Sequence, residues 1–311
     1  MNISDFSLER ISPDKLKDLV YLFKTVHSRK IPVTYFKNKF ETSFTKKSYI
    51  GYIAYHKNGE PAAFYGIFPC LLTNGSKIVL ASQSGDTITN PKYQKRGLFI
   101  HLAQQTYILA NKKGIEIIFG FPNKNSSYGF FNKLNWIKLN NFQSFAINYK
   151  SSNIYNILNR ISLTKVFYRL YFRIIYPFIL TEPFANSNFQ ENEFSILRDL
   201  PYFNYKTYEK SFFVKIKGFK FWFKFGDGLL IGDVEKFENS MNHDFFKALK
   251  KLNRILGTRK TTFHCMQNTF LNDILKEEFD HEDSIEIGVL LLNDNLKNCI
   301  FKFSYGDIDT F

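Results

Sequence analysis

The chain has 311 residues, of which 44% are hydrophobic and 18% aromatic, and its net charge is +14. This length favours two domains, and the hydrophobic content supports a sizeable core, so the composition excludes a disordered chain. The positive charge favours acidic partners such as nucleic acid, an anionic membrane or a polyphosphate ligand. Because the sequence has no dense Lys/Arg block and none of the usual nucleic-acid motifs, we expect no nucleic-acid partner.

The three cysteines, Cys70, Cys265 and Cys299, are widely spaced and form no CxxC pair, which argues against a disulfide scaffold or a metal site. The N-terminal residues lack the basic and apolar regions of a signal peptide. The longest apolar stretch, 166–180, is short and interrupted by Arg169, Arg173 and Pro177. We therefore expect no stable membrane insertion and a cytoplasmic location.

The first half of the chain begins with a helix signal at Ser12-Pro13, where Ser12 is placed to cap the helix. Two Asn-Gly pairs, Asn58-Gly59 and Asn74-Gly75, predict β-hairpins. The expected order is a helix, strands at 49–55, 62–72 and 77–87, a helix at 94–113, a strand at 115–121, a helix at 125–134 and a strand from Trp136. This pattern predicts a first domain over residues 1–150.

The second half begins with a basic, aromatic and helical connector at 151–180, followed by a segment at 181–205 without clear periodicity. Strands are expected at 211–217, 220–225 and 229–234, a helix at 242–256, a strand at 261–265, a helix at 267–278, and strands at 285–292 and near Phe301. The order echoes the first half. We therefore predict an α/β (α+β) fold of two tandem domains, each a mixed sheet flanked by helices, with the second domain at 206–311.

One stretch carries the signature of a phosphate site: a strand ends near Thr89, a turn with Pro91 follows, and Gln94 to Phe99 open a helix that contains Gly97. The free backbone amides of a helix start bind phosphate groups, and glycine lets a ligand approach the backbone closely. Lys92, Lys95 and Arg96 add positive charge beside this helix start.

This stretch resembles motif A of the GNAT acyltransferase superfamily, Q/R-x-x-G-x-G/A. Gln94 and Gly97 match the motif, and Phe99 stands where Gly or Ala is usual. The later stretch from Phe119 to Trp136 resembles motif B of the same superfamily. Phe131 stands there in place of a tyrosine that protonates the departing thiolate in many members, and Asn135 replaces the usual Gly.

The resemblance implies acyl-CoA as co-substrate, bound where two neighbouring strands of the sheet splay apart, with no metal. The pyrophosphate would lie on the backbone of Gln94, Lys95, Arg96, Gly97, Leu98 and Phe99. The pantetheine arm would pair with Ile88 and Thr89, and Asn123 and Ser126 would face it. An amine would then attack the thioester directly.

Asp86 is the candidate catalytic residue, because Asp is rare in strands and this one precedes the phosphate-binding turn. We expect it to act as general base or amine anchor. Ser82 and Ser84 should share its face, since strand side chains alternate, and Ser84 is expected to assist or to contact the substrate. The alternative is that Asp86 only caps the turn through the amide of Ile88.

The two-domain layout resembles the tandem-GNAT N-acyltransferases that act on dTDP-anthrose precursors and on dTDP-3-amino-3,6-dideoxyhexoses. That resemblance implies a nucleotide-linked amino sugar as acceptor and a role in bacterial surface polysaccharide (O-antigen or capsule) biosynthesis. The second domain would lack the CoA motif at residues 236–240 and help to form the acceptor cleft. Trp222, Tyr305 and Asp307 are the candidate acceptor-binding residues, with ordinary packing as the alternative for each.

Other readings remain open. Arg160, Lys165, Arg169 and Arg173 recur at nearly helical spacing, which fits a membrane-surface helix, a phosphate clamp or a bridging helix whose basic side chains extend over a core face. His264-Cys265 has no partner at metal-ligand spacing and is expected to pack in a core. The rival functions are a Fem-like transferase that uses aminoacyl-tRNA and a non-catalytic CoA-binding module. The sequence does not fix the oligomeric state.

Overall fold

The computed structural model describes residues 3–28, 31–150, 153–160, 165–187, 190–236 and 242–311. The chain divides into two compact units that interleave along the sequence. Unit 1 comprises residues 1–139, 191–208 and 286–300, and unit 2 comprises residues 140–190, 209–285 and 301–311. Each unit holds a mixed β-sheet flanked by helices, as expected for the α/β (α+β) class.

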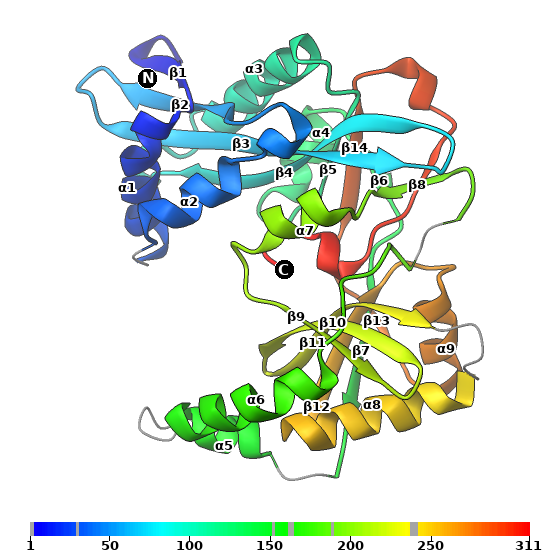
Figure 1. The fold of residues 1–311 in the computed structure, drawn as a ribbon. Coiled ribbons are helices and arrows are strands. Elements are labelled where there is room, and N and C mark those ends of the chain that lie inside the picture. The colour runs from blue at the N-terminus through cyan, green and yellow to red at the C-terminus, as the bar shows by residue number, and fades with distance from the viewer. Residues whose placement is uncertain (1–2, 29–30, 151–152, 161–164, 188–189, 237–241) are drawn as a thin grey trace. The chain divides into compact units, whose positions relative to one another are not determined.

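Unit 1 contains three longer helices and several short ones around its sheet (Figure 1). The helices are η1 (Ile3–Asp5), η2 (Pro13–Lys15), α1 (Leu16–His27), α2 (Val33–Phe40), η3 (Ser43–Thr45), η4 (Pro91–Tyr93), α3 (Leu98–Lys112), α4 (Ser127–Lys133), α7 (Leu200–Lys206) and η5 (Asp294–Leu296). The strands are β1 (Phe6–Arg10), β2 (Ile50–His56), β3 (Pro61–Thr73), β4 (Ile78–Thr89), β5 (Ile117–Gly120), β6 (Ile137–Leu139), β8 (Glu193–Ile196) and β14 (Ile287–Leu291).

The strand order in unit 1 is β1-β2-β3-β4-β5-β14-β6, and β8 pairs with β3. The only parallel neighbours in this order are β4 and β5, which α3 connects. One face of the sheet packs on α3 through a cluster that includes Tyr65, Tyr107 and Trp136. The other face packs on α1 and α2 through Leu19, Phe36 and their neighbours. These two cores hold the central strands in place, and they thereby also position the residues of β4 that follow Ser84.

Both predicted hairpins of unit 1 are present, as β2-β3 and β3-β4. Three details differ from the expectation. The helix α3 begins at Leu98 rather than Gln94, because Lys95 and Gly97 adopt positive φ angles of 59° and 76° that a right-handed helix cannot include. Ser12 lies at the N-cap of η2 but makes no capping bond through its side chain. The helix α2 was not predicted.

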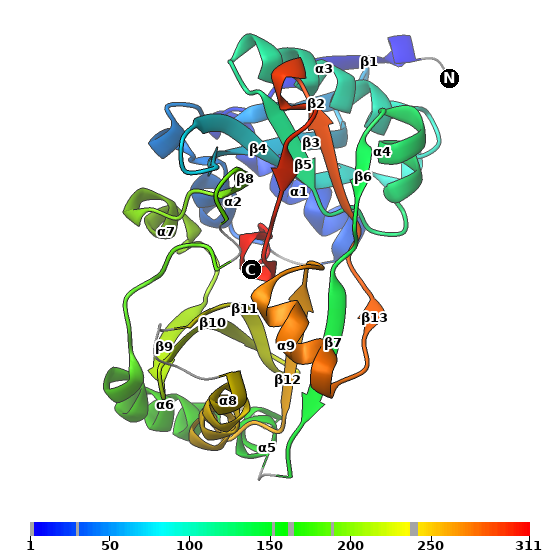
Figure 2. The same cartoon turned by 90° about the vertical axis from the view of Figure 1, so that its right-hand side faces the viewer.

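Unit 2 has the strand order β13-β7-β12-β11-β10-β9 (Figures 1 and 2). Its strands are β7 (Gln143–Asn148), β9 (Phe212–Ile216), β10 (Phe219–Gly226), β11 (Gly228–Lys236), β12 (Lys260–Cys265) and β13 (Glu282–Asp283). Its helices are α5 (Ile154–Arg160), α6 (Lys165–Ile179), α8 (Asn242–Leu256), α9 (Phe270–Glu278) and η6 (Tyr305–Asp307). The short strand β15 (Ile300–Phe301) spans the boundary between the two units.

The sheets of the two units share a pattern, since β11 and β12 are parallel and connected by α8, as β4 and β5 are by α3. Each sheet also takes a strand from the distant part of the chain. The strand β7 pairs with β12 in unit 2, and β14 pairs with β5 in unit 1. The duplicated element order expected from the sequence is therefore present, with exchanged strands that local patterns do not encode.

The helices α6 and α8 both pack on the core of unit 2. The connector expected at 151–180 is helical in its described parts, as α5 and α6; the side chains of Arg160 and Lys165 lie outside the described residues. The segment 181–205 was expected to be irregular but contains β8 and α7. The helix α7 begins after Asp199 because the Asp199 carboxylate caps it, accepting a hydrogen bond from the Tyr202 amide.

Candidate functional site

The strands β4 and β5 separate at the point where the sequence motif begins. Their parallel pairing runs from Ala81 to Ser84, where Ser84 lies opposite Gly120. Beyond Ser84, β4 continues to Thr89 while still paired with β3. The described β4–β5 pairing is therefore not continued along Gly85 to Thr89, and an extended ligand can pair with the β4 backbone there. The Ile88 side chain itself is buried in the core on the α1 and α2 side.

The turn after β4 is anchored by Glu60. Its carboxylate accepts hydrogen bonds from the hydroxyls of Tyr93 at 2.7 Å and Tyr21 at 2.9 Å, and it pairs with Lys92 at 3.2 Å. These three donors lower the pKa of Glu60 to about 2. Asn90 caps the turn, because its side-chain oxygen accepts from the Lys92 amide. Glu60 was not predicted as a site residue, and it fixes the turn that leads into the phosphate motif.

The loop from Gln94 to Gly97 leads into the first turn of α3. Gln94, Lys95 and Gly97 are exposed, and Gly97 is the N-cap residue with a φ of 76°. The first amides of α3 have no partner within the helix, so the loop and the helix start present backbone donors next to Lys95. Arg96 instead packs its guanidinium over the ring of Tyr93, 5.4 Å from the ring centroid. These donors match the chemistry of a pyrophosphate.

Phe99 departs from the family motif, and the structure shows what its side chain does. Its ring lies edge-on to Phe130, with centroids 5.1 Å apart. A Cβ placed on Gly129 would lie only 2.4 Å from Cε1 of Phe99. Gly129 thus provides the space that this phenylalanine needs, and the ring packs α3 on α4. Leu98 is likewise buried in the core below the loop.

Asp86 lies at a bulge in β4, with a φ of 51°, where the register between β3 and β4 shifts. Its Oδ1 is 2.8 Å from Nζ of Lys39, and only 1% of the Lys39 side chain and 10% of the Asp86 side chain are exposed. The Lys39 ammonium also lies over the ring of Phe68, at 4.8 Å. This ion pair places Asp86 on the α2 side of the sheet. Neither α2 nor Lys39 was predicted.

Ser84 faces the opposite, α3 side, so the expectation that Ser82, Ser84 and Asp86 share a face is wrong. The Ser84 Oγ is 2.7 Å from the hydroxyl of Tyr65, which is 3.1 Å from the hydroxyl of Tyr107. Trp136 Nε1 donates to Tyr107 at 3.0 Å. The bulge at Asp86 interrupts the alternation of side chains that the prediction assumed. Burial raises the pKa of Tyr65 above its usual value.

Asn123 and Ser126 form the turn before α4. The side-chain oxygen of Asn123 accepts from the amides of Asn125 at 2.9 Å and Ser126 at 3.2 Å. Both residues therefore shape the loop that follows β5. Their contact with pantetheine stays a prediction.

The ring of Phe131 lies against Lys138. Tyr128 is exposed, and the Lys133 ammonium lies over its ring.

The three candidate acceptor-binding residues all have packing partners within unit 2. Trp222 is fully buried, stacks on Phe213 and donates to Ser211 Oγ at 2.8 Å. Asp307 is buried and accepts from the Ser304 amide at 2.8 Å, which closes a capping box. Tyr305 is half-buried. Their role in acceptor binding stays a prediction, and residues 237–240, cited for the missing CoA motif, lie outside the described residues.

His264 and Cys265 pack as expected in unit 2. Burial lowers the pKa of His264 to about 4, and its Nδ1 is 3.0 Å from Ser284 Oγ. Burial also raises the pKa of the Cys265 thiol. Neither residue joins a group of metal-ligating side chains within the described ranges.

Residues 7–138 match the family model described as an acetyltransferase (GNAT) domain. This segment of the chain is therefore similar to a GNAT acetyltransferase domain, and it lies within unit 1. A search of curated proteins by sequence returns no match.

Several solved structures have the same fold. A GCN5-related N-acetyltransferase from Kribbella flavida has a TM-score of 0.62 at 11% identity, covering 93% of this chain and 71% of that one. A GCN5-related N-acetyltransferase from Anabaena variabilis has a TM-score of 0.60 at 15% identity, covering 93% and 73%. Saccharomyces cerevisiae N-myristoyltransferase with bound myristoyl-CoA has a TM-score of 0.53 at 13% identity, covering 92% and 83%. At these identities the likeness shows the fold.

Proposed function

We propose that the chain is an acyl-CoA-dependent N-acyltransferase, and that its acyl-CoA site lies in unit 1 where β4 separates from β5. The observation that carries the proposal is the end of the β4–β5 pairing at Ser84, after which β4 continues to Thr89 and leads into the glycine-capped start of α3. This part of β4 fits an extended pantetheine arm, and the exposed amides with Lys95 fit a pyrophosphate. The GNAT domain match over residues 7–138 supports the same site.

Acyl-CoA supplies a thioester carbonyl, at which an amine forms an N–C bond as the C–S bond breaks. Asp86 lies where β4 and β5 separate. We assign to Asp86 the role of acting on the amine substrate, either by accepting the proton of the amine or by holding the amine in place. The buried Lys39 fixes the Asp86 carboxylate for this task. Ser84, held by Tyr65, lies on the other side of the same opening and contacts the reacting group.

We further propose an acetyl or 3-hydroxyacyl donor such as 3-hydroxybutanoyl-CoA, and the C-3 or C-4 amino group of a dTDP-linked amino-dideoxyhexose as acceptor. The support is the tandem arrangement of two similar sheets and the net charge of +14, which suits two substrates that carry phosphates. A role in bacterial surface polysaccharide synthesis follows from that acceptor class. Trp222, Tyr305 and Asp307 remain its candidate contacts.

The test is release of free CoA thiol from acetyl-CoA or 3-hydroxybutanoyl-CoA with a panel of dTDP- and UDP-linked amino sugars. The variant Asp86→Asn should bind CoA like the wild type and lose turnover at least about a hundredfold. Asp14→Asn, at an exposed aspartate in the same unit, is the matched control and should keep full activity. CoA binding without release for any sugar would refute the acceptor, and no CoA binding would refute the proposal.

A further inference from the structure

The helix α6 of unit 2 exposes a continuous apolar stripe. Phe167, Leu170, Tyr171, Ile174 and Phe178 are between 40% and 84% exposed. Their spacing of three, four, seven and eleven residues places them on one side of the helix. The opposite side packs on the core of unit 2 through Phe172, Tyr176 and Ile179. The helix is thus apolar on both sides, and only one side is covered.

Further apolar side chains of the same sequence region are exposed as well. Nine of the eighteen large apolar side chains exposed in the described part of the chain lie within residues 154–180. The set comprises Ile154, Ile157, Val166, Leu180 and the five side chains of the stripe. Single exposed apolar residues are ordinary on a protein surface, whereas neighbouring ones such as the five of the α6 stripe mark an interaction surface.

Positive charge lies beside the stripe. Arg169 and Arg173 of α6 are exposed, and at about 100° per residue they lie between the stripe and the buried side of the helix. The sequence has no Asp or Glu between Glu116 and Glu182, so no acidic side chain of α5 or α6 offsets them. Their long apolar stems can lie along the helix while the guanidinium groups extend to a layer of anions.

The neighbouring helix α8 continues this positive surface. The Tyr168 hydroxyl on α6 donates to the Leu256 carbonyl at the end of α8, at 2.8 Å. Lys247, Lys250 and Arg254 are exposed on the outer side of α8, opposite the residues that it buries. Within the same helix, Asp244 pairs with Lys247 at 3.1 Å. Both helices lie on the same side of the unit 2 sheet (Figures 1 and 2).

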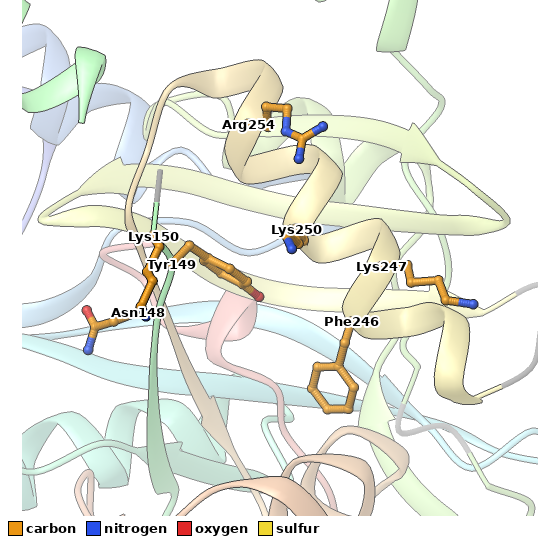
Figure 3. A pocket seen from close by; sticks show the side chains of 7 residues that line it. All are labelled: Asn148, Tyr149, Lys150, Phe246, Lys247, Lys250 and Arg254. Atoms are coloured by element: carbon orange, nitrogen blue, oxygen red, sulfur yellow. The ribbon is translucent and has the colours of Figure 1, made fainter. Parts of the chain in front are cut away.

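A pocket of about 600 Å³ opens beside Lys247, Lys250 and Arg254, which form the basic row of α8 (Figure 3). It is lined by Asn148, Tyr149, Lys150, Phe246, Lys247, Lys250 and Arg254. Four of these seven residues are cationic, and two are aromatic. Such a lining suits a phosphate ester whose apolar part contacts the rings. The headgroup of a phospholipid carries a phosphate ester of this kind.

We propose that unit 2 docks on the surface of an anionic phospholipid bilayer through the outer stripe of α6, with the basic row of α8 on the lipid phosphates. The fifteen residues of α6 span about 22 Å. Lying flat, such a helix buries its stripe roughly 5–10 Å into the boundary between headgroups and acyl chains. No helix in the described ranges has the length and apolarity to cross a membrane. This inference goes beyond the proposed acyl transfer and does not depend on it.

A second copy of the chain is the competing occupant, and the charges disfavour it. In a twofold contact between two α6 stripes, the same surface faces itself. Such a contact would bring together two α6 helices that carry Arg169 and Arg173 and no acidic side chain. An anionic bilayer supplies the missing counter-charges.

The test measures co-sedimentation of the full chain with vesicles of phosphatidylcholine alone and of phosphatidylcholine mixed with phosphatidylglycerol. The wild type should pellet with the mixed vesicles, and Leu170→Asn/Ile174→Asn should lower the partition coefficient at least about tenfold. The matched control is Ile108→Asn/Leu200→Asn, at similarly exposed positions of unit 1, which should behave like the wild type. Because all four side chains are exposed, both variants should keep the wild-type unfolding midpoint.

The role of the positive charges on α8 is tested with Lys250→Glu/Arg254→Glu, which should weaken binding to the mixed vesicles about tenfold or more. Lys17→Glu/Lys24→Glu makes the same change in net charge on exposed positions of α1 and should change binding less than about twofold. A site-specific probe is Phe178→Trp, whose emission should shift to the blue on mixed vesicles, whereas Ile78→Trp in unit 1 should not shift.

Three results would overturn the proposal: no pelleting of the wild type with mixed vesicles, equal binding by Leu170→Asn/Ile174→Asn, or an unshifted Phe178→Trp spectrum. A wild-type dimer in solution that Leu170→Asn/Ile174→Asn converts to a monomer, without vesicle binding, would identify the face as an interface between copies instead.

Discussion

Replacing Lys39 by Met should strongly destabilise unit 1, because it breaks a buried ion pair from one side. The Lys39 ammonium and the Asp86 carboxylate are 2.8 Å apart, and their side chains are 1% and 10% exposed. Removing one partner of such a pair leaves an uncompensated buried charge and costs about 3–5 kcal/mol. Lys39 also lies over the Phe68 ring, and Met keeps part of that packing. The cost should therefore come mainly from Asp86.

The assay is urea unfolding followed by fluorescence, with Lys39→Met, Asp86→Asn and the double variant in one cycle. Trp136 lies in unit 1 and Trp222 in unit 2, so the emission follows both units. The double variant should recover much of the stability, because it leaves neither charge buried alone, and the coupling energy should exceed about 2 kcal/mol. A loss below about 1 kcal/mol in Lys39→Met, or additive losses in the double variant, would show that the pair does not hold Asp86 in place.

Three further predictions concern the loop and its supports. Gly97→Val should weaken CoA binding at least about tenfold by calorimetry, because a β-branched residue disfavours the φ of 76° and a side chain crowds the helix start; unchanged affinity would place the pyrophosphate elsewhere. Gly129→Ala should cost about 1–3 kcal/mol of unfolding free energy, because its Cβ would meet the Phe99 ring, and adding Phe99→Leu should restore part of it. The lowered pKa of Glu60 means that its stabilisation is present above its unfolded pKa of about 4.3 and is lost as the pH falls through about 2. Glu60→Gln should therefore be less stable than the wild type above about pH 5, and thermal unfolding should show the difference shrinking towards pH 2.

Local patterns in the sequence predicted much of each sheet. Asn58-Gly59 and Asn74-Gly75 marked turns because their side chains and backbones suit tight hairpins, and β2, β3 and β4 follow. The limits of α8 agree with those predicted from the sequence, Asn242 and Leu256. The partners of β7 and β14 could not be predicted in this way, because both pair with strands more than a hundred residues away.

The candidate site was predicted in part for similar reasons. The motif around Gln94 and Gly97 is local, and the structure does place it at the start of α3. The partner of Asp86 comes from α2, forty-seven residues earlier, and only the tertiary fold brings Lys39 to it. A signal existed, since Lys39 stands among Phe36 and Phe40, on a helix face that is otherwise apolar. A lysine on such a face requires a buried anion, and Asp86 supplies it.

The bulge at Asp86 unites the two halves of the candidate site. A strand with regular alternation would turn residue 86 towards the same side as Ser84, into the cluster with Tyr65 and Tyr107. The positive φ of 51° instead turns the Asp86 carboxylate to the α2 side, where Lys39 compensates its charge. The same irregularity lies just beyond Ser84, the last residue of β4 that pairs with β5. A bulge bends its strand and increases the local twist, which favours the separation of β4 from β5. One strained residue thus both orients the carboxylate and opens the edge that we assign to pantetheine, and its strain is supported by the buried pair.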